Sequence, residues 1–255
     1  MNMTERQQKI RGLISKSGEV KISELEQLFP DISTMTLRRD LEKLETLGEI
    51  VRTRSGAKSI AYLSRLNEAQ FSERENENIA EKIHIAQIAH RHVLQGSSIF
   101  LDAGTTVTEL SRLLNKDKLF TITTAPNIAL ECAKNSENTV FMTGGRLSYG
   151  NLSLSGVNAL SFLDHINIDI AFIAASGFTF KSGFTCGNFD ECNLKKRVIE
   201  KAAKAIILMD SSKFGKNHPF TFAALTDINL LITDGRLVCN DLDELQSLGV
   251  VVITE

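Results

Sequence analysis

Several features that would place this 255-residue chain in a specialised class of protein are scarce or missing. Its longest uninterrupted apolar run is Ile170 to Ala175, whereas a membrane helix needs roughly 20 apolar residues, so we expect no transmembrane segment. The 42% of hydrophobic and 24% of charged residues are ordinary for a globular protein and exclude a disordered or collagen-like chain. Residues 1–12 lack the apolar stretch of a secretory signal, which predicts a cytoplasmic protein.

Metal-binding and catalytic motifs are also missing. The four cysteines (Cys132, Cys186, Cys192 and Cys239) are far apart without CxxC spacing, which argues against a disulfide framework or a zinc site and for a reducing compartment. The five histidines show no metal-ligand spacing with acidic or thiol partners. The sequence contains no GxSxG, GxGxxG or P-loop motif. We therefore predict neither a metal nor a cofactor.

Charge is unevenly distributed along the chain. Residues 1–65 contain 12 Lys and Arg against 9 Asp and Glu, a net charge of +3. The other 190 residues contain 17 Lys and Arg against 22 Asp and Glu, a net charge of −5. A basic first segment on an acidic body is expected when only that segment meets phosphate groups.

The pattern of residues 1–63 predicts three short helices and a hairpin. Ile10, Leu13 and Ile14 have the spacing of one apolar helix face. Ser23 followed by Glu26 predicts a capping box at the start of a second helix. Between these two helices, residues 19–22 alternate between charged and apolar side chains, which is typical of a short strand.

A third helix and a hairpin follow. Ser33 is an expected N-cap, and Leu37, Leu41 and Leu44 lie on one side of the helix after it. Ser55–Gly56 then predicts the turn of a hairpin. This order of elements defines a winged helix-turn-helix.

The third helix and the hairpin carry hydroxyl and basic side chains that suit DNA phosphates and guanine edges, and a helix N-terminus adds a partial positive charge. The predicted DNA-binding residues are Ser33, Thr34, Thr36, Arg38, Arg39, Arg52, Arg54 and Lys58. The alternative is a three-helix capping module with a solvated basic face. The complete order of three helices and a wing favours DNA.

Residues 64–81 are polar and acidic, which predicts a linker. From residue 82 to residue 255, short apolar runs alternate with helical stretches, which predicts an α/β domain with a mostly parallel sheet. The predicted strands are 98–101, 119–123, 139–142, 168–174, 205–209, 230–233 and 250–254, and the predicted helices are 107–115, 126–135 and 191–203. In such a sheet, a ligand binds in the crevice at the carboxyl ends of the strands.

The turns after these strands are rich in groups that bind a phosphorylated polyol. Asp102, Gly104, Thr105 and Thr106 follow the first strand, where free N–H groups at a helix start and hydroxyl donors attract an anion. Similar groups follow the other strands, and one lysine of the later helix reaches the same place. These predicted effector-binding residues are Thr124, Asn127, Gly144, Gly145, Arg146, Gly177, Lys195, Asp210 and Lys213.

The quoted motifs resemble the DeoR/GlpR family of bacterial transcriptional regulators. The matching pieces are ISTMTLRRDLEKLETLGEIVRTRSGA near the start and EKIHIAQIA, LDAGTT, TGGRLS, DECNLKKRVI and DSSKFG later. The resemblance implies a winged-helix DNA reader joined to a sensor domain similar to ribose-5-phosphate isomerase. It also implies double-stranded operator DNA as a partner, a phosphorylated sugar as effector, and a homodimer or homotetramer.

We therefore expect a cytoplasmic repressor of carbohydrate catabolism genes that a phosphorylated sugar releases from its operator. The alternative is a sugar-phosphate isomerase-like enzyme with an added DNA-binding module, in which Glu191 and Lys213 serve as acid–base groups. The Asp-Gly-Ala-Asp pattern of the isomerase is compared with Asp169–Phe172 here, where the second acid is absent. The loss of that carboxylate argues for binding without turnover. The sequence leaves open whether the regulator represses or activates.

Overall fold

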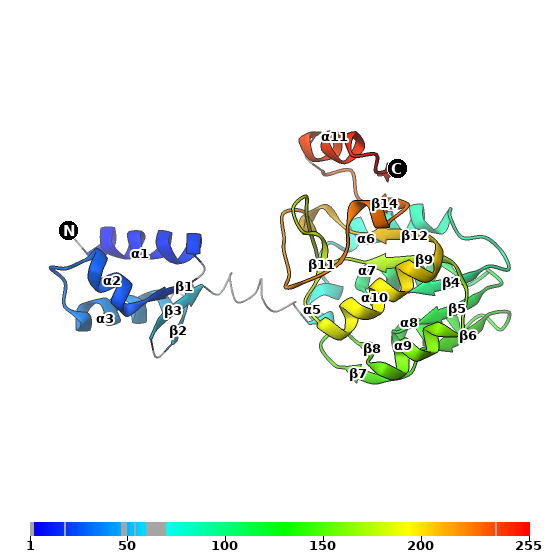
Figure 1. The fold of residues 1–255 in the computed structure, drawn as a ribbon, viewed down its shortest axis with the longest axis horizontal. Helices are drawn as coiled ribbons and strands as arrows, with labels where there is room; N and C mark the ends of the chain where they lie inside the picture. Colours follow the sequence, from blue (N-terminus) through cyan, green and yellow to red (C-terminus); the bar gives the residue numbers. More distant parts are fainter. Residues whose placement is uncertain (1–2, 18, 47–49, 54, 60–69, 238) are drawn as a thin grey trace. The chain divides into compact units, whose positions relative to one another are not determined.

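A computed structural model describes residues 3–17, 19–46, 50–53, 55–59, 70–237 and 239–255 of the chain (Figure 1). The chain divides into two compact units, Met1–Asn67 and Glu68–Glu255. No helix in the described part of the chain is long and apolar enough to cross a membrane.

The first unit is a three-helix module with a small antiparallel sheet, as predicted. Its helices and strands are α1 (Met3–Ser17), β1 (Glu19–Lys21), α2 (Ile22–Leu28), α3 (Thr34–Thr46), β2 (Ile50–Thr53) and β3 (Gly56–Ser59). β3 lies between β1 and β2 and is antiparallel to both, so β2 and β3 form the expected wing.

The periodic apolar residues of the three helices meet in one core. The core comprises Ile10, Ile14, Val20, Leu25, Phe29, Leu37, Leu41, Leu44, Ile50 and Ala57. A buried ion pair between Arg6 of α1 and Asp40 of α3 also joins two helices, and Gln7 donates a hydrogen bond of 2.9 Å to Asp40. The apolar faces of the helices and these polar contacts to Asp40 therefore fix how α1 packs on α3.

The predicted capping box at Ser23 and Glu26 is wrong. α2 begins at Ile22, and the backbone N–H of Lys21 donates to the Glu24 carboxylate at 2.9 Å. Ser23 therefore lies inside the helix, because β1 leads into α2 without an intervening loop. The Glu26 carboxylate instead accepts a 2.6 Å hydrogen bond from the Thr34 hydroxyl, which joins α2 to α3.

Part of the predicted linker, residues 64–81, is helical. Helix α5 (Phe71–Glu75) lies inside this segment, and α6 (Ile79–His90) begins in it. Phe71 is buried, and its N–H donates to the carbonyl of Gly150 at 2.7 Å. The Arg74 guanidinium also donates to the Asn151 side chain at 3.1 Å, so an aromatic anchor and a polar contact together hold this segment on the domain.

The second unit is built on a seven-stranded, all-parallel sheet with the order β15-β14-β12-β9-β4-β5-β6. Its strands are β4 (Ser98–Leu101), β5 (Phe120–Thr123), β6 (Thr139–Met142), β9 (Ile168–Ala174), β12 (Ala202–Leu208), β14 (Leu230–Ile232) and β15 (Val252–Ile253). Because all seven run the same way, their carboxyl ends lie along one edge of the sheet.

Both faces of the sheet are buried, and successive residues of each central strand enter opposite cores. Ile206 and Leu208 of β12 pack in one core, and Ile207 between them packs in the other. Helices α6, α7 (Thr105–Leu113) and α8 (Pro126–Cys132) cover the first face, and α9 (Val157–Asp164) and α10 (Phe189–Lys201) lie on the second (Figure 1). This pleat explains why the strands appear as unbroken apolar runs.

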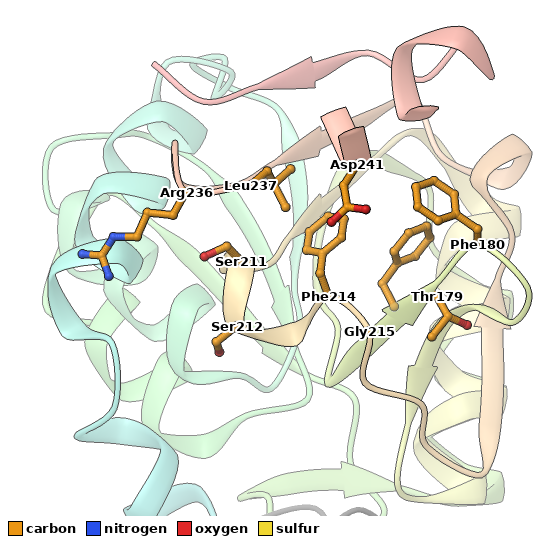
Figure 2. Close-up of a pocket in the computed structure, with 10 residues that line it drawn as sticks. Thr179, Phe180, Ser211, Ser212, Phe214, Gly215, Arg236, Leu237 and Asp241 are labelled. Carbon is orange, nitrogen blue, oxygen red and sulfur yellow. The ribbon is translucent and has the colours of Figure 1, made fainter. Parts of the chain in front are cut away.

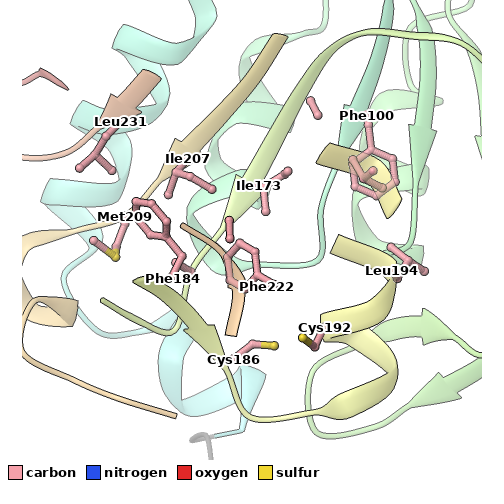
Figure 3. Close-up of a cluster of buried hydrophobic side chains, with 14 of the residues drawn as sticks. Phe100, Ile173, Phe184, Cys186, Cys192, Leu194, Ile207, Met209, Phe222 and Leu231 are labelled. Atoms are coloured by element: carbon pink, nitrogen blue, oxygen red, sulfur yellow. The ribbon is translucent and has the colours of Figure 1, made fainter. Parts of the chain in front are cut away.

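Two antiparallel sheets and short helices complete the unit. The strand pair is β7 (Arg146–Ser148) with β8 (Ser153–Ser155), and the three-stranded sheet has the order β10 (Gly177–Thr179), β11 (Gly183–Cys186) and β13 (Phe220–Ala223). The remaining elements are η1 (Ser211–Lys213), η2 (Leu225–Asp227) and α11 (Cys239–Ser247). Phe184 and Phe222 of the three-stranded sheet pack with Ile173 and Ile207 in the second core (Figure 3).

Candidate functional site

The N-terminus of α3 is fixed by its own hydroxyl side chains. The Ser33 hydroxyl accepts a hydrogen bond from the backbone N–H of Thr36 at 3.3 Å, which confirms Ser33 as the N-cap, and it also bonds the Thr36 hydroxyl at 2.9 Å. Thr34 donates to Glu26 on α2. These hydroxyls thus set the position of α3 relative to α2 while Ser33 and Thr34 stay exposed.

The exposed face of α3 presents a short set of DNA-compatible groups. Arg38 and Arg39 are exposed next to one another, and Met35 is 65% exposed one turn earlier. Met35 was missed from the sequence because it reads as an apolar core residue, yet an exposed apolar side chain suits a thymine methyl group. The face therefore combines cationic and apolar chemistry.

The three basic residues predicted for the wing differ in their surroundings. Arg52 is bound to Glu45 of α3 through a 2.6 Å ion pair, and its backbone N–H donates to the same carboxylate at 2.9 Å. Hydrogen bonds from Arg52 lower the pKa of Glu45, so the guanidinium holds β2 against α3. Lys58 lies in β3 opposite Glu19, and Arg54 lies outside the described residues.

A buried ion pair joins two predicted site residues in the second unit. Asp102, at the end of β4, and Lys195, on α10, are both nearly inaccessible and are in direct contact. Asp102 also accepts a 2.9 Å hydrogen bond from the N–H of Ala174, and Lys195 donates to the carbonyl of the same residue at 2.9 Å. The pair therefore clamps the carboxyl end of β9 between β4 and α10.

The loop after β4 comes close to the end of β9. A Cβ placed on Gly104 would lie 2.5 Å from the Cβ of Ala174, so only glycine fits there. Thr105 and Thr106 open α7 and are buried. The first N–H groups of a helix have no partner within that helix and attract anions.

A second loop contacts the same helix. The Asn127 amide nitrogen donates to the Thr108 hydroxyl at 3.1 Å, while its buried carbonyl oxygen has no hydrogen-bond partner among the described residues. Thr124, which is also buried, accepts a 2.7 Å hydrogen bond from Leu154 through its carbonyl. The loops after β4 and β5 are thus joined through α7 and present one unsatisfied acceptor.

A group of positive charges surrounds Asp210, which follows β12. Lys82 on α6 is almost fully buried, and its ammonium group interacts electrostatically with Lys213 and Asp210. Burial lowers the pKa of Lys82 and Lys213 lowers it further, whereas Asp210 acts in the opposite direction. Burial likewise lowers the pKa of Lys216, and Lys213 again adds to the effect. Lys82, Lys213 and Lys216 thus lie close enough together beside Asp210 to influence one another, and they are called the lysine cluster below.

Hydrogen bonds position this cluster. The Asp210 carboxylate accepts from the Ser212 backbone N–H at 3.1 Å and from the Asn78 amide at 3.3 Å, and Asn78 also donates to the Ser212 hydroxyl at 3.1 Å. Lys82 was missed because it lies ahead of the strands. A signal was present, since Lys82 occupies the apolar stripe of Ile85, Ala86 and Ala89, which is an unusual place for a lysine.

The other predicted residues divide between this edge and its surroundings. Gly177 begins β10, where an added Cβ would lie 2.5 Å from the carbonyl oxygen of Lys216. Gly144 and Gly145 turn the chain from β6 into β7. The guanidinium of Arg146 is exposed and forms a 2.9 Å ion pair with Asp190, so Arg146 is already paired.

Asp169–Phe172, the stretch compared with the isomerase pattern, lies within β9. These residues lie in the first half of β9, where Asp169 accepts a 2.8 Å hydrogen bond from the N–H of Ser98 and Phe172 is buried in the core. The carboxyl end of β9 reads Ala174-Ala175-Ser176-Gly177, which has no carboxylate either. Glu191 accepts two hydrogen bonds from Asn151, at 2.9 and 3.0 Å.

The geometry defines a class of protein: a winged helix-turn-helix unit and an α/β unit whose strand ends gather lysines, hydroxyl groups and a helix N-terminus. Residues 6–62 match the DeoR-like helix-turn-helix domain, and residues 77–235 match the DeoR C terminal sensor domain. The chain belongs to the DeoR family of helix-turn-helix transcriptional regulators.

Relatives match along almost the whole length. The HTH-type transcriptional regulator GlpR of Haloferax volcanii is 35% identical, over 98% of this chain and 96% of that protein. The lactose phosphotransferase system repressor of Streptococcus mutans is 34% identical, over 98% and 97%. Among solved structures, ribose 5-phosphate isomerase A of Methanocaldococcus jannaschii has a TM-score of 0.41 at 22% identity, covering 55% of this chain and 56% of that one. These curated relatives are both named as transcriptional regulators or repressors.

Proposed function

We propose that this protein is a cytoplasmic repressor of carbohydrate catabolism genes, and that a phosphorylated sugar releases it from operator DNA. The lysine cluster of Lys82, Lys213 and Lys216 is the observation that supports the effector most strongly. Like charges held close to a buried site repel one another, and a bound phosphate dianion neutralises them.

The surroundings of the cluster fit the rest of a sugar phosphate. The α7 N-terminus at Thr105 and Thr106 offers backbone N–H groups and hydroxyls, and Asn127 has an unsatisfied carbonyl oxygen that suits a sugar hydroxyl. α6, which carries Lys82, packs against α7. Phosphate and polyol groups are thus both matched at the carboxyl edge of the sheet.

The DNA side of the proposal rests on α3. We propose that a homodimer or homotetramer places α3 in the major groove of each half-site, with Arg38 and Arg39 on phosphates or guanine edges. Release requires that the effector bind the DNA-incompetent arrangement more tightly than the competent one. The reported relatives include a repressor of a lactose system, which supports a sugar operon as the target.

A thermal-shift screen against sugar phosphates tests the effector. A ligand that binds only the folded protein raises the melting temperature, by an amount that depends on ligand concentration over Kd. The shift should fall sharply in Lys213→Ala and remain in Lys116→Ala, which removes an equally charged side chain from a loop outside the cluster. A panel without any hit, or a shift that Lys213→Ala leaves intact, would contradict the proposed effector site.

Titration of duplex DNA at several salt concentrations tests the proposed DNA-binding face of α3. Each phosphate contact contributes about 0.9 to the slope of log K against log salt, so Arg38→Ala with Arg39→Ala should flatten that slope by up to about two. Lys9→Ala on the exposed side of α1 serves as the matched control and should leave the slope unchanged. An unaltered slope in the double variant would remove both arginines from the interface.

A further inference from the structure

A separate pocket is lined in part by residues of the turn that carries Lys213. It has a volume of about 380 Å³, within the range of roughly 300–1,000 Å³ that small-ligand sites occupy. Its walls come from β10, from η1 with the residues after it, from the loop after β14, and from α11. The lining combines three phenylalanines with polar groups, as Figure 2 shows.

The aromatic side of the pocket is preorganised. Phe178 packs edge-to-face against Phe180 and Phe214, with ring centroids 5.3 Å apart in both pairs. Phe178 is buried, whereas Phe180 and Phe214 are half-buried and keep part of their ring surface accessible. Rigid rings of this kind accept an apolar carbon face without losing side-chain entropy.

The polar side of the pocket contains one carboxylate available to a ligand. Asp241 of α11 directs its carboxylate beside the Phe214 ring (Figure 2). Across the described ranges of the chain, no hydrogen bond or ion pair engages this carboxylate. Arg236, which lines the same pocket, points its guanidinium away from the rings and pairs with Glu81 on α6. The pocket therefore offers a hydrogen-bond acceptor whose charge Arg236 does not neutralise.

The two walls of the pocket are tied together by a buried carboxylate. Asp234 accepts 3.2 Å hydrogen bonds from the backbone N–H and the hydroxyl of Ser211, and a 3.0 Å bond from the N–H of Arg236. Ser211 and Ser212 also belong to the turn that carries Lys213. A ligand in this pocket therefore contacts the turn that also forms one side of the lysine cluster.

We propose that this pocket is a second ligand site, distinct from the lysine cluster, which binds the ring of an unphosphorylated sugar. The C–H face of the ring packs on Phe180 and Phe214, and its hydroxyl groups donate to Asp241. The Ser211 hydroxyl at the opposite wall donates to Asp234 and can still accept a hydrogen bond from a sugar hydroxyl. A phosphate group has no cationic partner here, because Glu81 already engages Arg236.

Isothermal titration of the full chain with glucose, galactose, fructose and ribose tests the site. At least one of these sugars should bind, and Asp241→Asn should weaken that binding by about fivefold or more, because a neutral amide oxygen replaces a charged acceptor. Asp243→Asn, the same change at an exposed position of α11, is the matched control and should bind like the unaltered protein. Phe180→Ala should weaken the same sugar, whereas Lys213→Ala should leave its affinity unchanged.

Several results would overturn the assignment. If none of the four sugars binds, or if Asp241→Asn binds them as tightly as the control, the pocket is not a sugar site. Binding of glucosamine alone would show that the carboxylate selects a positive charge rather than hydroxyl groups. Loss of sugar binding in Lys213→Ala with retention in Asp241→Asn would place the sugar in the lysine cluster instead.

Discussion

Removing Lys195 should destabilise the α/β unit strongly, because it leaves a carboxylate buried without its counter-ion. Lys195 and Asp102 are 5% and 3% exposed. Once the lysine is gone, the N–H of Ala174 is the one remaining hydrogen-bond partner of the Asp102 carboxylate among the described residues. Breaking a buried ion pair from one side costs about 3–5 kcal/mol. We therefore expect Lys195→Met to lower the free energy of unfolding by that amount.

Removing both charges should cost much less. In the double variant Lys195→Met with Asp102→Asn, the amide oxygen can still accept from Ala174, and no buried charge remains. Replacing a complete buried pair by groups of similar volume is often nearly neutral. Lys196→Met changes the next residue of α10, which is exposed, and is expected to match the unaltered protein.

Urea unfolding followed by far-UV circular dichroism gives the free energies, and hydrogen exchange of peptides from β4 and β9 shows where the structure opens. If the free energy of unfolding of Lys195→Met is within about 1 kcal/mol of the parent's, the ion pair is not an important clamp. If the double variant is as unstable as Lys195→Met, the unpaired charge of Asp102 is not the cause of the lost stability.

The contribution of Lys195 also has a defined pH dependence. Burial alone lowers its pKa, but Asp102, Cys186 and Glu191 outweigh burial and raise the pKa above the usual 10.5. Because the folded value exceeds the unfolded one, the stabilisation is complete below 10.5 and declines only as the pH rises through the folded value. The difference between the parent and Lys195→Met should therefore be constant from neutral pH up to 10.5.

Three further outcomes follow from single positions. Burial lowers the pKa of Lys82 below 10.5, so calorimetry should show phosphate affinity falling as the pH approaches 10.5 and proton uptake on binding. Lys82→Gln should reduce both effects, and the remainder should come from Lys216, whose pKa burial also lowers. Gly104→Ala forces a Cβ to within 2.5 Å of Ala174 and should cost about 1–3 kcal/mol in urea unfolding, whereas Gly12→Ala, with no atom nearby, should not destabilise. Asp40→Ala breaks the buried pair with α1 and should expose the first unit to proteolysis, and resistance equal to the parent would contradict this.

Local patterns predicted most of the secondary structure. The helical period of 3.6 residues places Leu37, Leu41 and Leu44 on one side of α3. A strand alternates its side chains every two residues, and β9 is apolar on both faces, so it appears as an apolar run. Both patterns depend only on neighbours along the chain. Element boundaries were less predictable. Ser23 looked like a cap, but β1 runs directly into α2. The polar segment around Phe71 is helical and contacts Gly150 and Asn151, which are distant in the sequence.

Parts of the candidate site could also be predicted. The residues after β4, from Asp102 to Thr106, and those after β12, from Asp210 to Lys213, follow strands whose carboxyl ends share one edge in any parallel sheet. The pairing of Arg146 with Asp190 could not be anticipated, because the β7–β8 hairpin that positions Arg146 has no strong local signal.

The sequence by itself determined which segments become helices and strands and which turns supply anion-binding groups, since these follow from periodicity and local chemistry. Only the tertiary structure decided that Lys82 joins Lys213 beside Asp210, that Lys195 neutralises Asp102, and that Asp241 faces an aromatic pocket. These contacts join positions far apart in the chain. They form only when the packing of α6, α10 and α11 around the sheet fixes which side chains meet.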